Sequence, residues 1–261
     1  MAHPLDGVRL KLDRAEEHIK TFREERDAYL ARHISGITFE DDEEFRHMFF
    51  VVHEPPPGRF STILGDCIHN IRSSLDHLAW QLVLANPPNQ PTRDTAFPIF
   101  SSKDLYRKNA TNRIKGMRPE AVALIEGLQP YCGGQSPLNH PLWFLYELDN
   151  ADKHRTLNLT QSKVFPVRAW ITTKESGEAG IAPAWIASGI VHDGAKIASF
   201  RRSDYLPEDY VKMQASGVVA ITLQDAGLWG QKDVLDLTEK ARDFVRSELL
   251  PGFEPFFDLT P

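Results

Sequence analysis

The chain has 261 residues, of which 41% are hydrophobic and 25% are charged, and its formal net charge is −6 at pH 7. This composition is typical of a globular protein with a sizeable core, and it argues against fibrous and disordered classes and against a broadly cationic nucleic-acid coat. Two cysteines are too few for a disulfide framework, the first 17 residues are polar, and no apolar run approaches the roughly 20 residues of a membrane span, so we expect a cytoplasmic protein without a membrane partner.

The N-terminal part is predicted to be a long helix followed by a hairpin. Apolar residues at alternating spacings of four and three predict an amphipathic helix that ends at Gly36; they are Val8, Leu12, Ala15, Ile19, Phe22 and Tyr29. Two strand-like pieces, residues 37–39 and 48–53, flank an acidic turn and predict a β-hairpin. A run of three prolines and Gly58 then breaks the chain.

A second long helix is predicted from about residue 60 to residue 84. Its apolar stripe is broad, which indicates a helix buried on most of its circumference. Polar side chains on such a helix need partners, because an unpaired buried polar group costs about 1–3 kcal/mol. Two short helices are expected within residues 102–130, the second starting near Pro119, and a strongly apolar helix is expected from about Pro141 to His154.

The character of the chain changes after Thr156. Four short, alternating, β-branched pieces predict antiparallel strands at residues 157–171, 181–191, 196–200 and 217–223, and a final amphipathic helix covers about residues 232–249. We therefore predict an α+β fold. Residues 1–156 would form a helical bundle with the hairpin 37–53 as an insertion, and residues 157–261 an antiparallel β-meander and a C-terminal helix that packs on the bundle.

A dense group of polar side chains lies on the second long helix. His69, Arg72, Ser73 and Asp76 share one helical face, and His77 lies beside that face. A buried arginine needs a carboxylate or phosphate partner, and Asp76 one turn along can supply it. A histidine beside an arginine is pushed towards its neutral form, which suits a general base near neutral pH. These five side chains are the candidate catalytic residues.

Two other polar segments are candidates for substrate binding. Lys153, His154 and Arg155 end the apolar helix in a cluster that also holds Asp149, Asn150 and Asp152, although these cations also complement the negative end of the helix dipole. A basic run is a candidate for binding phosphate groups, although charge runs are more often solvated helix faces; its cations include Arg107, Lys108, Arg113 and Lys115.

The stretch Arg72-Ser-Ser-Leu-Asp-His77 resembles the signature of the HEPN superfamily of small helical proteins, and its hydrophobic context with Ile71, Leu75 and Trp80 is also similar. Many HEPN proteins are metal-independent ribonucleases of toxin–antitoxin, abortive-infection and CRISPR systems, and a second subunit often completes their cleft. The resemblance implies RNA as the substrate, a homodimer and no cofactor. His77 would then be the acid–base group and Arg72 the cation for the developing charge, with Ser73 on the phosphate and Asp76 orienting Arg72 or His77.

Two alternatives stay open. In one, the protein binds a partner without catalysis, the β-meander presents the binding surface, and an Arg–Asp–His network is structural. In the other, the protein is a metal-dependent hydrolase. Asp66 and His69, one turn apart, would bind the ion together with His77, Asp152 or His154, although the chain has no dedicated metal-binding motif.

Overall fold

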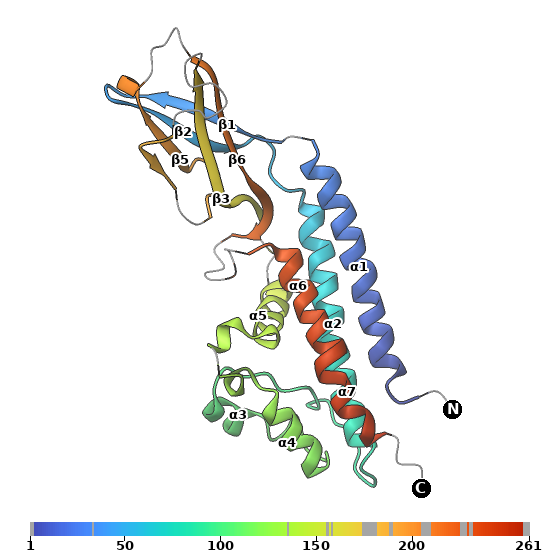
Figure 1. Ribbon diagram of the computed structural model, residues 1–261. Helices are drawn as coiled ribbons and strands as arrows, with labels where there is room; N and C mark the ends of the chain where they lie inside the picture. Colours follow the sequence, from blue (N-terminus) through green and yellow to red (C-terminus); the bar gives the residue numbers. More distant parts are fainter. Residues whose placement is uncertain are drawn as a thin grey trace. The chain divides into compact units, whose positions relative to one another are not determined.

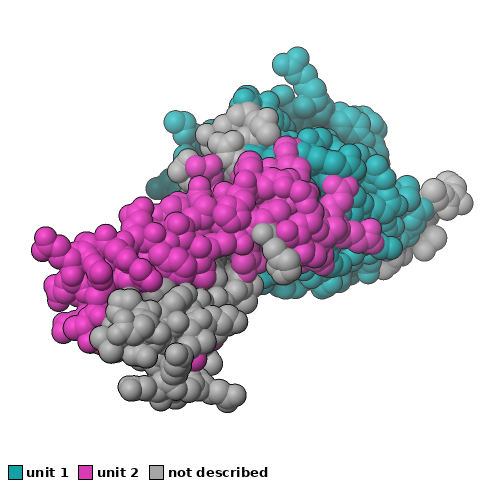
Figure 2. Space-filling model, turned by 90° about the horizontal axis from the view of Figure 1, so that it is seen from above, with its two compact units in different colours: residues 1–23, 59–157, 235–261 teal, residues 24–58, 158–234 magenta. Residues whose placement is uncertain are grey.

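The computed structural model is described for residues 3–32, 34–134, 136–154, 157, 159–173, 182–187, 190–204, 210–224, 229 and 232–257. The chain has the predicted α+β fold and divides into two compact units (Figure 2). Unit 1 comprises residues 1–23, 59–157 and 235–261, and unit 2 comprises residues 24–58 and 158–234. Among the described residues, no helix combines the length and the hydropathy that crossing a membrane requires.

Unit 1 is built from helices (Figure 1). Most of them match predicted segments. They are α1 (Asp6–Leu30), α2 (Gly58–Leu84), α3 (Lys103–Asn109), α4 (Pro119–Gly127), α5 (Pro141–His154), α6 (Val234–Asp243) and α7 (Leu250–Phe253). The last turns of α1 belong to unit 2. The predicted C-terminal helix is interrupted, because Phe244–Leu249 between α6 and α7 is π-helical.

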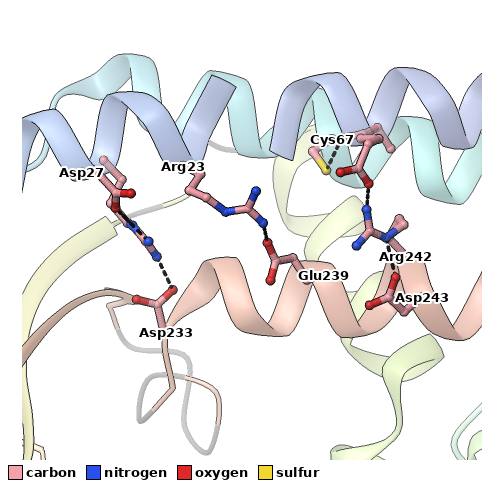
Figure 3. A network of polar contacts seen from close by, with 10 residues as sticks. Arg23, Asp27, Cys67, Asp233, Glu239, Arg242 and Asp243 are labelled. Atoms are coloured by element: carbon pink, nitrogen blue, oxygen red, sulfur yellow. Dashed lines mark hydrogen bonds and ion pairs between the residues drawn. The ribbon is translucent and has the colours of Figure 1, made fainter. Parts of the chain in front are cut away.

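The apolar stripe of α1 is part of the core of unit 1. Its members are no more than 2% exposed from the first turn to Phe22: Val8, Leu12, Ala15, Ile19 and Phe22. Phe22 meets Phe60 of α2 with ring centroids 5.3 Å apart. Ion pairs of Arg23 with Glu239 and of Arg242 with Glu16 also link α1 to α6 (Figure 3).

The extended segment 97–100, between α2 and α3, is held by polar side chains of the helices. Asp76 Oδ1 accepts a hydrogen bond from Phe97 N at 2.9 Å, and Arg72 Nη2 donates to Phe97 O at 2.8 Å. The buried Gln129 donates to Pro98 O at 2.8 Å and accepts from Phe100 N at 3.0 Å. These bonds satisfy the backbone of a segment that belongs to no helix or sheet.

Unit 2 contains a four-stranded antiparallel sheet in the order β1-β2-β5-β4 and a separate pair, β3 and β6. The strands are β1 (Ser35–Asp41), β2 (Phe45–Val52), β3 (Leu159–Thr173), β4 (Trp185–Ile186), β5 (Lys196–Arg201) and β6 (Tyr210–Leu223). A core cluster that includes Phe50, Phe200 and Ile171 packs the inner face of the sheet against β3.

The two units are not consecutive in the chain, which differs from the predicted division at residue 156. Unit 1 does pass into unit 2 after Leu157, but the hairpin 37–53 belongs to unit 2 rather than to the bundle. The reason is the pairing of β2 with β5, from Phe45↔Arg201 to Phe49↔Lys196. The strand predicted over residues 181–191 is limited, in its described part, to the short β4 and an isolated bridge at Val191.

Candidate functional site

The polar faces of α2 and α5 meet in unit 1 around a pocket of about 560 Å³, which we name the Arg72 pocket. Helix α2 contributes Arg72 and Asp76, and α5 contributes Asp149, Asn150 and Lys153. The sequence predicts these two polar clusters separately. The structure brings them together, because both helices turn their remaining faces towards the core of unit 1.

Arg72 is the most deeply buried cation of this pocket, with a side chain that is 9% exposed. Its Nη2 lies 2.9 Å from Asp76 Oδ1 and also donates to the carbonyl of Phe97. Its Nη1 is buried and has no hydrogen-bond partner among the described residues. Burial lowers the pKa of this guanidinium, and the carboxylates of Asp76 and Asp149 oppose that shift. Arginine stays protonated in proteins, so Nη1 is a charged donor without a partner among the described residues, and an oxyanion in the pocket would reach this buried atom once the neighbouring side chains move aside.

A buried carboxylate, Asp149, organises the α5 side of the pocket. Its side chain is only 4% exposed, and Oδ2 accepts a hydrogen bond from Lys153 Nζ at 2.5 Å. Its Oδ1 lies 3.7 Å from Nδ1 of His69 on α2. Asp149 therefore pairs with a cation of its own helix and contacts an imidazole of α2.

Helices α2 and α5 approach each other closely just beyond this carboxylate. A Cβ atom on Gly65 would clash with the carboxyl group of Asp152, so any larger residue here would force that side chain to shift. Burial raises the pKa of Asp152, and the negative charges of Asp149 and Asp66 raise it further. The end of α5 thus places a second carboxyl group, in addition to that of Asp149, against α2. This group holds its proton more tightly than an ordinary aspartate.

His77 lies outside the Arg72 pocket. Residues five apart on an α-helix diverge by about 140°. Arg72 lines the pocket, whereas His77 is exposed and faces the start of α1, where a Cβ on Gly7 would come within 3.1 Å of its Nδ1. Ser73 is half-buried and does not line the pocket. Within one chain, the two residues of the HEPN-like motif do not meet at one site.

The candidate substrate-binding residues divide in the same way. Lys153 and Arg113 line the pocket, and the guanidinium of Arg113 lies 5.2 Å from the ring centroid of Phe100. The other described candidates are exposed and do not line it: Arg107, Lys108, Lys115 and His154. Arg155 lies outside the described residues.

Sequence reasoning missed four polar residues that line the pocket: Asp94, Asn109, Asn112 and Tyr146. Tyr146 belongs to the helix predicted to be strongly apolar, but it lines the pocket and stacks on Trp143 with ring centroids 5.1 Å apart. Asn109 and Asn112 are uncharged members of the basic run, and no local pattern marks them. A carboxylate four residues before Lys153 is the signal that could have singled out Asp149.

The pocket is suited to a strongly polar ligand. Three cationic and three anionic side chains line it: Arg72, Arg113, Lys153, Asp76, Asp94 and Asp149. The cations can bind an oxyanion, and an imidazole beside a buried carboxylate can transfer a proton. Within the described part of the chain, no group of three or more His, Cys, Asp or Glu side chains is placed to hold a metal ion.

The likeness to the HEPN superfamily is confined to the motif on α2. Comparisons with protein-family models, with curated proteins and with solved structures found no match to this chain.

Proposed function

We propose that this protein is a metal-independent endoribonuclease and that the Arg72 pocket receives the scissile phosphodiester. One observation carries the proposal: the buried guanidinium of Arg72 lines the pocket with Nη1 unpartnered among the described residues. A phosphate oxygen suits this donor, because hydrogen bonds between arginine and phosphate are charge-assisted. The HEPN-like stretch from Arg72 to His77 supports RNA as the source of that phosphate.

The reaction would be attack of the ribose 2′-OH on the neighbouring phosphorus. The O2′–P bond forms and the P–O5′ bond breaks, which leaves a 2′,3′-cyclic phosphate and a 5′-OH. Negative charge grows on the phosphate oxygens during this step, and Arg72, Arg113 and Lys153 are the cations that line the pocket to stabilise it.

The test is cleavage of labelled single-stranded RNA by the full chain in excess EDTA. Wild-type protein should produce fragments with 2′,3′-cyclic phosphate ends. Lys153→Ala and Arg113→Ala should each lower the rate about 10- to 100-fold, because each removes a cation from the pocket. Arg107→Ala is the matched control, since Arg107 is exposed outside the pocket, and its rate should equal that of the wild type. RNA that stays intact, or equal rates for all four proteins, would contradict the proposal.

The proposal includes a homodimer in the cytoplasm. HEPN ribonucleases often need a second subunit, and light scattering should give about twice the 29.6 kDa of one chain.

Both cysteines, the buried Cys67 and the exposed Cys132, are free thiols in the structure, which fits a reducing compartment.

A second candidate function is non-catalytic binding of a small polar ligand. Arg72 also holds the backbone of Phe97, and as many acidic as basic side chains line the pocket, which favours a ligand with both donors and acceptors. Adenosine monophosphate, which has a phosphate but no internal phosphodiester, is a suitable probe. If it raises the Tm of the wild type and not of Lys153→Ala, while RNA stays intact, the binding function is supported and the ribonuclease proposal fails.

A further inference from the structure

We infer that His69, positioned by Asp149, is the proton-transfer group of the Arg72 pocket, whereas the HEPN-like motif assigns this role to His77. The inference builds on the proposed ribonuclease function and names the group that accepts the 2′-OH proton. It concerns two histidines of the same helix, both exposed to solvent.

The contact between His69 and Asp149 is the first argument. An aspartate beside one ring nitrogen fixes the orientation of an imidazole and leaves the other nitrogen free for substrate. Here Nδ1 of His69 lies 3.7 Å from Asp149 Oδ1, so Nε2 is the nitrogen left for a 2′-OH. Hydrogen bonds of catalytic groups are often long without substrate and shorten in the substrate complex.

The position of Asp149 is the second argument. This carboxylate lines the Arg72 pocket, and its other oxygen is held by Lys153, which lines the pocket too. His69 itself lies next to the pocket rather than in its lining, and Asp149 is the residue that connects its imidazole to the cations there. The His69 side chain is 60% exposed while that of Asp149 is 4% exposed, so substrate can reach the imidazole and water is excluded from most of the carboxylate.

The surroundings of His77 are the third argument. Neither histidine is among the residues that line the pocket, but His69 contacts a carboxylate that does, whereas His77 makes no ion pair with a carboxylate among the described residues. Its ring instead lies next to Gly7 at the start of α1. Nothing in these contacts orients its ring towards Arg72.

The proton balance of the step is simple. Nε2 of His69 takes the proton of the 2′-OH as the O2′–P bond forms. The P–O5′ bond breaks, the departing 5′-oxygen takes a proton from water, and the imidazolium later returns its proton to solvent. Asp149 keeps its negative charge throughout and stabilises the imidazolium.

The experiment compares His69→Ala with His77→Ala in RNA cleavage by the full chain. His69→Ala should lower kcat about 100-fold or more with KM within about twofold, because general-base catalysis contributes about 10²–10⁴. His77→Ala should stay within about twofold of the wild type. Added imidazole should restore part of the activity of His69→Ala and none of that of Lys153→Ala, which a structural role of His69 would not produce.

Two further variants test the part of Asp149. Asp149→Asn should lower kcat and weaken the rescue, since the carboxylate no longer stabilises an imidazolium, whereas Asp104→Asn, exposed on α3 outside the pocket, should leave kcat within about twofold. If His69→Ala is poorly folded, His69→Gln replaces it, because an amide can still meet Asp149 but cannot take the proton.

The outcomes separate the inference from the proposed function. Cleavage by His69→Gln and His69→Ala at the wild-type rate, or loss of cleavage only in His77→Ala, overturns the inference and leaves the ribonuclease function standing. Wild-type protein that leaves RNA intact overturns the proposed function and the inference with it.

Discussion

At the scale of single residues, burial decides which of the two thiols can react. Burial raises the pKa of Cys67, and its Sγ donates to Ala15 O at 3.5 Å, whereas Cys132 is exposed. Only the thiolate is a good nucleophile. Ellman's reagent should therefore modify one thiol in the native protein and two in denaturant. The Cys132→Ser variant should have no reactive thiol in the native state. A rapidly reacting thiol in that variant would mean that Cys67 is not buried between α1 and α2.

A second residue, Asp42, links the stability of unit 2 to pH. It accepts backbone hydrogen bonds from Phe45 at 2.6 Å and Glu44 at 2.9 Å and lies 2.9 Å from His47 Nε2. These contacts, the bond from Phe45 first, lower the pKa of Asp42 from 3.8 to about 2. A depressed carboxyl pKa gives stability that is fully present above the unfolded value and is lost as the pH falls through the folded value.

The Asp42→Asn variant checks this dependence. Its free energy of unfolding should be lower than that of the wild type at pH 5, and the difference should shrink between about pH 4 and pH 2 as the wild-type carboxyl group takes up its proton. Denaturant titrations at several pH values measure it. A difference that does not change with pH would show that the carboxylate charge is not what stabilises the turn.

At the scale of elements, the approach of α5 to α2 depends on Gly65. Gly65→Ala would place a Cβ against the carboxyl group of Asp152 and should destabilise unit 1 by about 1 kcal/mol, the low end of the usual cost of overpacking, because the end of a side chain can shift. Gly127→Ala is the control, because no atom lies within 4 Å of a Cβ at the end of α4. Urea denaturation should show a lower midpoint for the first variant, and a wild-type midpoint would contradict the close packing of α2 on α5.

The sequence predicts those elements whose signal is local. The stripe from Val8 to Phe22 identifies α1, and Pro119 marks the start of α4. Strand β6 begins at Tyr210, earlier than the predicted residue 217, because its extent follows from pairing with β3 and not from its own alternation. The π-helical segment between α6 and α7 has no sequence pattern that the apolar spacing could reveal.

The candidate site was predictable in its parts but not in its assembly. Local spacing identifies Arg72 with Asp76 on α2, and the density of charge identifies the end of α5. That Asp149 is buried and reaches His69 depends on how two distant helices pack, and no periodicity within either helix contains that information. The motif by itself favours His77, because a motif does not show which way each side chain points.

At the scale of the whole molecule, each of the two compact units contains buried apolar residues. Phe253 is fully buried in unit 1 and meets Phe97 edge-on at 6.5 Å. Phe253→Ala should destabilise unit 1 by about 3–5 kcal/mol, the usual cost of removing a buried phenyl ring. Native-state hydrogen exchange should then show faster exchange in α1 and α2 and unchanged protection in β2 and β5. Equal losses in both units would show that the two units unfold together.

The order of the units along the chain has a consequence for synthesis on the ribosome. Helices α1 and α2 emerge early, but part of their core comes from α6 and α7, which follow the whole of unit 2. The sheet can complete its strands while the helical unit still lacks its last segment. Until α6 and α7 are synthesised, apolar surface on the nascent α1 and α2 stays exposed. A chain that stops translation before residue 235 would release a finished sheet beside an unfinished bundle, which is the kind of surface that chaperones bind.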